Sequence, residues 1–370
     1  MRKIKYPNGT QFIAAYLKIF EDEKDDLQQK FTSLKGTYSV KLSFLPGNID
    51  EILKADFSQL VDWYKSFIVL KQNTRNAINK RLEKIFNYNK WRDKIAEYFM
   101  DPSNGFNISS CYYCDMTYIN GYKVDAVAEG LFFLNEATED DLKKLTSSAI
   151  RRKKIFKSKP FKNISQFNDI TKSFKWSKDK LEKTVLGNKK NYKYQFDLDH
   201  VLPKSECRFV ALSLFNFVPC CQICNQRLKR VKVLGHEGTP SVNLSPTSDT
   251  YEFDSNSRFY IIPNEHINVA SICPSSHPQD YTLQLVSDNE DYDFFIKLFD
   301  LKNRYQHHKK IALHWLEMKY KYSDARIKML SNALDPSNFT FERIKSDIFQ
   351  DSLYESGDLS FSKLRKDILG

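Results

Sequence analysis

Two short cysteine pairs that lie far apart in the chain constrain its fold more than any other feature. Cys111 and Cys114 form one CxxC motif, Cys221 and Cys224 form a second, and 107 positions separate the pairs (221 − 114 = 107). Two such pairs supply the four thiolates of a tetrahedral structural zinc site. The chain must therefore bring both segments to one metal ion. Cys220 directly precedes the second pair and leaves a CxxxC alternative for its ligands.

The remaining cysteines and the composition place the chain in a broad class. Seven cysteines in 370 residues, four of them in close pairs, are typical of metal binding in a reducing compartment and not of a disulfide framework. Cys207 and Cys273 have no such partners and are expected to be small buried residues. The basic first residues are not followed by an apolar run, and no stretch is long and apolar enough to cross a membrane. The sequence therefore predicts a soluble cytoplasmic protein with no membrane partner.

Positive charge is concentrated in one stretch, from Lys143 to Tyr194. It holds 17 Lys or Arg residues and three acidic ones, which gives 17 − 3 = +14, whereas the whole chain carries +11 and the rest therefore 11 − 14 = −3. Aromatic residues are interleaved with the cations, and this suits a polyanion whose phosphates attract charge and whose bases stack on rings. A lysine-rich solvated insertion explains the same composition. If the stretch binds phosphates, the densest cations are the expected contacts: Arg151, Arg152, Lys153 and Lys154.

Hydrophobic periodicity predicts an α+β protein that is mostly α-helical and divides into three regions. Residues 1–110 repeat apolar side chains at intervals of three and four, which predicts helices, except that the alternation in 35–48 predicts a short extended piece and a turn. Residues 111–240 contain both cysteine pairs and the basic insertion 143–194. Residues 241–370 start irregularly, the segments RFYIIP and YTLQLV predict short strands, and helical periodicity returns after them.

The segment 195–230 concentrates the residues that can carry chemistry. Its sequence, QFDLDHVLPKSECRFVALSLFNFVPCCQICNQRLKR, places Asp199 beside His200, Asn216 16 positions after the histidine (216 − 200 = 16), and Asn225 nine positions further (225 − 216 = 9). The apolar residues around the acid predict a strand that ends at the histidine, NFVP predicts a returning strand, and CQICNQRLKR predicts a short helix. Such a hairpin and helix would bring two oxygen donors close together, and hard oxygen ligands suit Mg²⁺.

This segment, together with the first cysteine pair, resembles the HNH, or ββα-metal, endonuclease family. The resemblance implies a ββα-metal HNH core with a structural zinc site, flanked by helical N- and C-terminal regions. It implies that His200 is the general base, that Asp199 and Asn225 bind a catalytic Mg²⁺ or Mn²⁺ ion, and that Asn216 braces the loop and the histidine. Asparagine replaces the last histidine of the motif and keeps an oxygen ligand there. Insertions between the cysteine pairs are usual in the family, but the one here is longer.

A narrower resemblance is to HNH nucleases of bacterial anti-phage defence systems, including Septu-type pairs in which the nuclease works beside an ATPase. The pieces DLDHVLPKS, ALSLFNFVPCCQICN and LFDLKNRYQHHKKIA carry this resemblance. It implies a nucleic-acid substrate, with DNA favoured over RNA, and an ATPase partner protein. Cations near the motif are expected to contact flanking phosphates, namely Lys204, Arg227, Lys229 and Arg230.

Two other functions fit parts of the sequence. A non-catalytic, zinc-dependent nucleic-acid-binding module would use the cysteines and the basic insertion alone, and it would have no need of an acid and a histidine facing a helix asparagine. A scaffold subunit built on an HNH core would not require Asp199, His200 and Asn225 to be intact. The sequence therefore favours an enzyme, a phosphodiester hydrolase.

Overall fold

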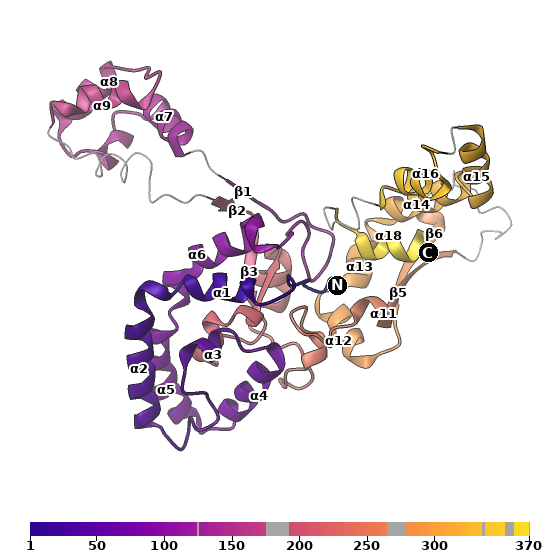
Figure 1. Cartoon of the computed structure of the whole chain (residues 1–370), viewed down its shortest axis with the longest axis horizontal. Coiled ribbons are helices and arrows are strands. Elements are labelled where there is room, and N and C mark those ends of the chain that lie inside the picture. The colour runs from indigo at the N-terminus through magenta and orange to yellow at the C-terminus, as the bar shows by residue number, and fades with distance from the viewer. Residues whose placement is uncertain (124–125, 175–191, 265–277, 335–336, 352–358, 370) are drawn as a thin grey trace. The chain divides into compact units, whose positions relative to one another are not determined.

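The computed structural model divides the chain into two compact units (Figure 1). Unit 1 comprises Met1–Asn120 and Gln195–Gly370, and unit 2 comprises Gly121–Tyr194, which is inserted between them. The structure describes residues 1–123, 126–174, 192–264, 278–334, 337–351 and 359–369. Residues 175–191 of the predicted basic insertion, and Cys273, lie outside this description.

The N-terminal part of unit 1 is helical, as its periodicity predicted. Its helices are α1 (Gln11–Lys18), α2 (Lys24–Thr37), α3 (Ile49–Leu53), α4 (Phe57–Ile68), α5 (Gln72–Ile85) and α6 (Tyr88–Met100). The expectation of an extended piece within 35–48 was wrong. The chain instead leaves α2 through turns, with the amide of Leu42 donating to the carbonyl of Tyr38 (2.9 Å). Leu42 and Leu45, three residues apart, are both buried, which is a helical spacing and not the alternation of a strand.

A hairpin and a short helix follow where the chain re-enters unit 1. Strand β3 (Asp197–His200) pairs antiparallel with β4 (Phe217–Cys220), and the π-helix η6 (Ile223–Lys229) follows. The loop between the strands contains the short 3-10 helices η4 (Arg208–Leu212) and η5 (Leu214–Asn216).

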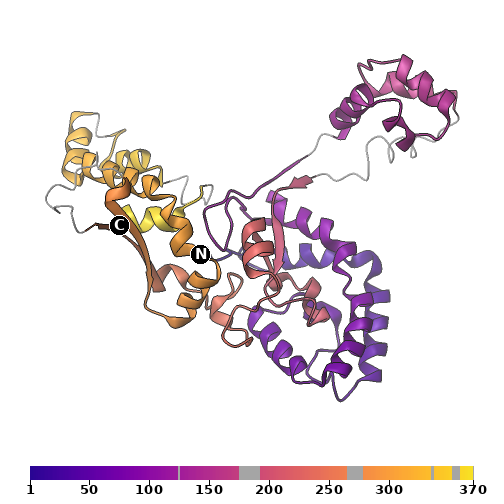
Figure 2. The same cartoon turned by 180° about the vertical axis from the view of Figure 1, so that it is seen from behind.

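The β3–β4 loop is held against the N-terminal helices, as the view from behind shows (Figure 2). The Tyr16 hydroxyl donates to the carbonyl of Leu212 (2.6 Å), and the Ser213 hydroxyl donates to the carbonyl of Ile52 (2.9 Å). Both bonds are buried, so the N-terminal helices fix the loop that joins the two strands.

The C-terminal part of unit 1 contains a second antiparallel pair, β5 (Ser257–Pro263) with β6 (Tyr281–Ser287), where strands were expected. In β6 the side chains of Tyr281, Leu283 and Leu285 are buried in alternation with more exposed residues, because successive side chains of a strand point to opposite faces. The surrounding helices are α11 (Phe253–Asn256), α12 (Glu290–Leu298), α13 (Leu301–Gln306), α14 (Lys309–Lys321), α15 (Asp324–Ala333), α16 (Phe341–Phe349) and α18 (Ser362–Leu369).

Unit 2 has a core of its own. Strands β1 (Gly121–Lys123) and β2 (Tyr192–Tyr194) pair at its two ends, and between them lie α7 (Ala126–Glu136), α8 (Ala149–Lys157) and α9 (Ile164–Lys172). The helices and their connections bury a cluster of apolar side chains: Leu134, Ala137, Leu142, Leu145, Ile155, Phe161 and Phe167. The basic stretch is therefore partly built on a packed helical unit that begins at Gly121.

The observed class is a mostly helical α+β fold with small two-stranded sheets, as the sequence predicted. Within the described ranges, no helix has the length and apolar character needed to span a membrane.

Candidate functional site

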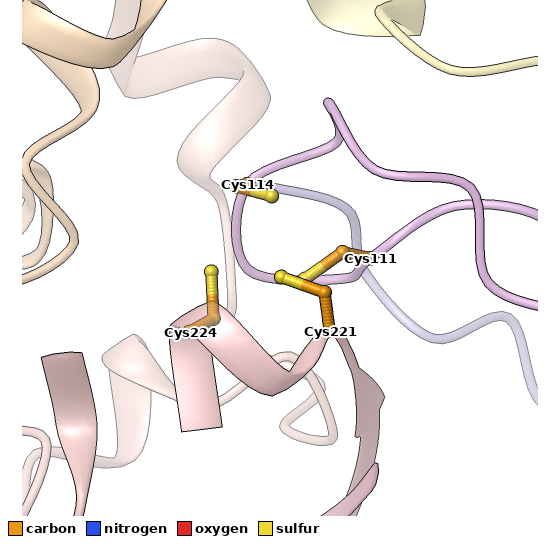
Figure 3. A group of neighbouring side chains, drawn as sticks. All are labelled: Cys111, Cys114, Cys221 and Cys224. Carbon is orange, nitrogen blue, oxygen red and sulfur yellow. The ribbon is translucent and has the colours of Figure 1, made fainter. Parts of the chain in front are cut away.

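The four cysteines of the two CxxC motifs form one buried cluster near the hairpin (Figure 3). Their Sγ atoms all lie within 4.8 Å of one another. Zinc–sulfur bonds of about 2.3 Å place the sulfurs of a tetrahedral site about 3.8 Å apart, so the cluster fits a structural Zn²⁺ ion with no open position. Cys220 does not belong to it, because its thiol faces the carbonyl of Asp197 (3.7 Å). The ligand set is therefore Cys111, Cys114, Cys221 and Cys224.

The first cysteine pair lies on a tight turn. The amide of Asp115 donates to the carbonyl of Cys111 (2.8 Å), and the amide of Cys111 donates to the carbonyl of Thr117 (2.9 Å). A hydrogen bond from the Cys111 thiol holds the pKa of Cys114 well below its usual value. A bond with Cys111 likewise lowers the pKa of Cys221 to about 6. Burial raises the pKa of Cys111. Although the bond with Cys111 lowers the pKa of Cys224, the bonds with Cys114 and Cys221 outweigh it and raise that pKa. Two thiols of the cluster therefore lose their protons readily and two do not, and zinc binding would draw all four into the thiolate form.

Helix α13 contributes residues to this centre that sequence reasoning missed. The Arg304 guanidinium donates to Cys224 Sγ (3.4 Å), and the Tyr305 hydroxyl donates to the carbonyl of Cys114 (2.7 Å). Burial lowers the pKa of Arg304, but the Cys224 and Cys114 thiolates outweigh it and raise this pKa above its usual value. A zinc ion with four thiolates carries a net negative charge, so Arg304 is a fitting counter-charge. No spacing rule links it to the cysteines, because the contact is made only by the fold.

Asp199 lies on the face of β3 that packs against η6, and it is 3% exposed. The Tyr113 hydroxyl donates to its Oδ2 (2.6 Å), while Lys229 Nζ lies 3.0 Å from Oδ2 and 3.2 Å from Oδ1. Burial raises the pKa of Asp199, and the Lys229 charge and the Tyr113 bond oppose this rise. Lys229 also donates to the carbonyl of His200 (2.9 Å). Both carboxylate oxygens are therefore engaged inside the protein.

The two residues predicted to bind Mg²⁺ contact different partners. The Asn225 side chain donates to Asp197 Oδ2 (3.0 Å), as does the Gln226 side chain (2.9 Å), while Asp199 pairs with Lys229. Mg²⁺ requires oxygen ligands that converge in near-octahedral geometry. The arrangement of Asp199 and Asn225 does not fit that ion while Lys229 neutralises the carboxylate.

His200 has contacts distinct from those of Asp199. Its Nε2 lies 3.0 Å from the carbonyl oxygen of Ala211. A carbonyl only accepts, so this bond assigns the hydrogen to Nε2 and leaves the Nδ1 lone pair available as a base. Burial, with the positive charge of Lys204, lowers the pKa of His200 to about 3. The imidazole is therefore neutral at physiological pH, and the same low pKa makes it a weak base in this arrangement.

Tyr88, the first residue of α6, is a further neighbour that no motif in the sequence points to. Its ring meets the His200 ring edge-on, with centroids 4.6 Å apart, and Phe217 packs on the same imidazole at 4.9 Å. Lys204 Nζ lies 3.8 Å from the centroid of the Tyr88 ring, and burial lowers the pKa of Lys204 to about 8. The predicted base thus sits in an aromatic enclosure with a half-buried cation beside it.

Asn216 is fully buried and ties the two ends of the β3–β4 loop together. Its Oδ1 accepts from the amide of Leu202 (2.8 Å), and its Nδ2 donates to the carbonyls of Leu202 (3.1 Å) and Val210 (3.0 Å). Val210 directly precedes Ala211, whose carbonyl fixes the His200 ring. Asn216 therefore holds the segment that orients the histidine.

The predicted nucleic-acid contacts differ in how accessible they are. Arg227 and Arg230 are exposed and Lys204 is half-buried, whereas Lys229 is completely buried and turned toward Asp199. Lys229 is therefore not available to a phosphate in this arrangement.

In α8 of unit 2, the Arg152 guanidinium donates hydrogen bonds to the carbonyls of Thr146 (3.2 Å) and Ser147 (2.5 Å). Arg151 and Lys154 lie over the Phe174 ring, 5.2 Å and 5.3 Å from its centroid, and Lys153 is exposed. Lys153 and Lys154 are therefore more accessible to a phosphate than Arg152, whose guanidinium is already hydrogen-bonded.

Comparisons with protein-family models, curated proteins and solved structures give no match. The resemblance to HNH nucleases accordingly rests on the motif residues themselves.

Proposed function

We propose that this protein is a zinc-stapled HNH endonuclease that hydrolyses phosphodiester bonds in nucleic acid, with DNA favoured over RNA. The observation that carries the proposal is the state of His200. Its Nε2–H is held by the Ala211 carbonyl, which leaves Nδ1 as the ring atom that can take a proton, and it ends the first strand of a hairpin whose loop Asn216 braces. The zinc cluster supports the assignment, because Tyr113 of the CYYC turn reaches Asp199, the neighbour of the proposed base.

In the proposed reaction, Nδ1 of His200 takes a proton from water as the water oxygen attacks phosphorus. The bond from phosphorus to the 3′ oxygen breaks, and the departing alkoxide takes a proton from solvent, which leaves a 5′-phosphate and a 3′-hydroxyl. The imidazolium returns its own proton to solvent before the next cycle. Tyr88 and the Ala211 carbonyl hold the ring in place, and Lys204 is the nearby cation suited to a substrate phosphate.

The test is cleavage of plasmid, single-stranded DNA and RNA by the purified protein with Mg²⁺ or Mn²⁺. His200→Ala should lose cleavage and keep its fold and nucleic-acid affinity, because it removes the base and no zinc ligand. His314→Ala is a matched control, since His314 is exposed on α14. Equal cleavage by wild type and His200→Ala would contradict the proposal.

A non-catalytic, zinc-dependent nucleic-acid-binding module or scaffold is the second candidate, and one observation favours it. The Asp199 carboxylate is already paired with Lys229, so the protein holds no ready site for Mg²⁺ on that residue. Under this alternative, the protein binds nucleic acid but cleaves none of the three substrates with any divalent ion.

We further propose that the nuclease acts in the cytoplasm as the effector of a bacterial anti-phage defence system, beside an ATPase. The support is the resemblance of the DLDHVLPKS and LFDLKNRYQHHKKIA segments to that group. Contacts to phosphate and sugar select little sequence, so a nuclease of this kind needs external control. Co-expression with its genomic neighbours, followed by purification through a tag on this chain, should recover an ATPase. A monomer that is fully active and equally toxic without those neighbours would refute this.

A further inference from the structure

A fully buried lysine occupies the place where the sequence predicted a divalent cation. The side chains of Lys229 and Asp199 are 1% and 4% exposed, and Nζ contacts both carboxylate oxygens and the carbonyl of His200. A buried ion pair recovers its desolvation cost only when its geometry is good and its remaining hydrogen bonds are satisfied. This pair meets both conditions, and Tyr113 completes the carboxylate's bonds.

The geometry of η6 places Lys229 against Asp199. Asn225 and Lys229, four residues apart in η6, both face β3, the first bonded to Asp197 and the second to Asp199. The segment is a π-helix, and the residue that ends it, Arg230, has φ +55° and ψ −121°, a conformation that costs a non-glycine residue energy. π-Helical turns and backbone strain of this kind gather at functional sites.

We infer that Lys229 and a divalent cation compete for the Asp199 carboxylate, so that the protein's own lysine closes the metal site until it is displaced. This rests on the proposed nuclease function. An ammonium and a divalent ion cannot share one buried carboxylate, because their charges repel strongly where water is excluded. The lysine has a flexible four-carbon stem, so the ammonium can turn away from the carboxylate by side-chain rotation. Once it leaves, Oδ1 of Asp199 is free of its lysine partner, and Oδ2 keeps only the hydrogen bond from Tyr113.

The test is Mn²⁺ binding to the full chain, measured by titration calorimetry or by the electron paramagnetic resonance signal of free Mn²⁺. Lys229→Met keeps the apolar stem and removes the charge, and it should bind Mn²⁺ at least tenfold more tightly than wild type. The matched control is Lys363→Met, because Lys363 is also buried and paired with a carboxylate, Asp367 at 2.8 Å. The double variant Lys229→Met with Asp199→Asn should lose the gain. Unchanged Mn²⁺ affinity in a folded Lys229→Met protein would overturn the inference.

A second measurement uses the wild type, in case Lys229→Met fails to fold. Mn²⁺ should raise the reactivity of Lys229 toward an amine-modifying reagent several-fold, as quantified by mass spectrometry, and leave Lys363 unchanged. Constant reactivity of Lys229 at saturating Mn²⁺ would overturn the competition. Failure of the nuclease proposal would look different. If Lys229→Met binds Mn²⁺ more tightly but neither it nor the wild type cleaves nucleic acid, the nuclease proposal is wrong and the competition between Lys229 and the cation still holds.

Discussion

The cysteine cluster and the Asp199 site are built from the same two segments, but at the Asp199 site a buried cation, Lys229, already contacts both donor atoms. The CYYC turn gives two cysteines to the first centre and Tyr113 to the second, and η6 gives Cys224 to the first and Lys229 to the second. The four sulfurs face one another within 4.8 Å, whereas both Asp199 oxygens face a lysine. Four thiols that converge on one point, with the Arg304 cation at the edge, indicate a metal ion, and a carboxylate that already holds a cation does not.

This difference separates stability from function. The zinc centre joins segments 107 positions apart, and the free energy of zinc binding becomes folding free energy when no preformed site exists in the unfolded chain. The Asp199–Lys229 pair is complete without an added ion. The first centre is therefore expected to be indispensable to the fold, and the second to be adjustable.

Loss of a zinc ligand should have the largest effect. Cys224→Ser should leave the chain unfolded at 25 °C, because structural zinc contributes about 10 kcal/mol or more, comparable to the whole stability of a typical domain. Cys207→Ala is the matched control, since Cys207 is equally buried outside the cluster and should cost only about 1–2 kcal/mol. Circular dichroism and elemental analysis check this, with about one zinc per folded chain. A folded, zinc-free Cys224→Ser protein would show that the two centres do not differ in this way.

Loss of the proposed base should come next. His200→Ala should lower the cleavage rate by about 10²–10⁴-fold, the usual contribution of a general base, and change the melting temperature far less than a zinc-ligand variant does. Single-turnover cleavage and thermal denaturation measure the two effects side by side. If the rate falls only together with loss of the folded protein, His200 has a packing role.

Replacement of Tyr88 should have a moderate effect. Tyr88→Leu retains apolar volume but removes the ring edge that meets His200 and the face on which Lys204 rests. Such aromatic and cation–π contacts contribute about 1 kcal/mol each, so a decrease in cleavage rate of about tenfold is expected. Tyr320→Leu, at an exposed tyrosine on α14, is the control. Rescue by Tyr88→Phe, which restores the ring, separates positioning by the ring from any effect of the hydroxyl.

The sequence predicted what spacing and residue type can encode. The two CxxC motifs identified the cluster, because paired thiols have few other uses in a chain of this kind, and alternation identified β5 and β6. The sequence could not show that Lys229 turns inward to Asp199 while Asn225 reaches Asp197. Both contacts depend on how η6 packs against β3. Because lysine is rarely buried, Lys229 was expected to be exposed.

Contacts between distant segments were also beyond the sequence. Tyr88 lies 112 positions before His200 (200 − 88 = 112), and Arg304 lies 80 positions after Cys224 (304 − 224 = 80). Neither belongs to a recognisable motif, so only the three-dimensional arrangement reveals that α6 and α13 complete the two centres.

Helix α8 of unit 2 provides the third case, in which Lys153 and Lys154 are exposed to solvent, and it should give the smallest effect. Lys153 and Lys154 are the exposed members of the α8 cluster, while Arg152 is occupied with backbone carbonyls and is best left in place. Each phosphate contact on duplex DNA adds about 0.9 to the slope of log affinity against log salt, so Lys153→Gln with Lys154→Gln should flatten the slope by about 1.8 if both lysines bind phosphate.

The control for this experiment is the pair Lys310→Gln and Lys328→Gln, two exposed lysines of α14 and α15. The measurement is fluorescence anisotropy of a labelled duplex across a salt series, with the catalytically inactive His200→Ala background so that cleavage does not intervene. A slope unchanged by the unit 2 variant would mean that these lysines are only solvated, and that the positive charge of the insertion does not recognise the substrate. A slope changed equally by both variants would mean that the protein attracts the duplex through its net charge, because only a localised contact makes the α8 lysines differ from the other two.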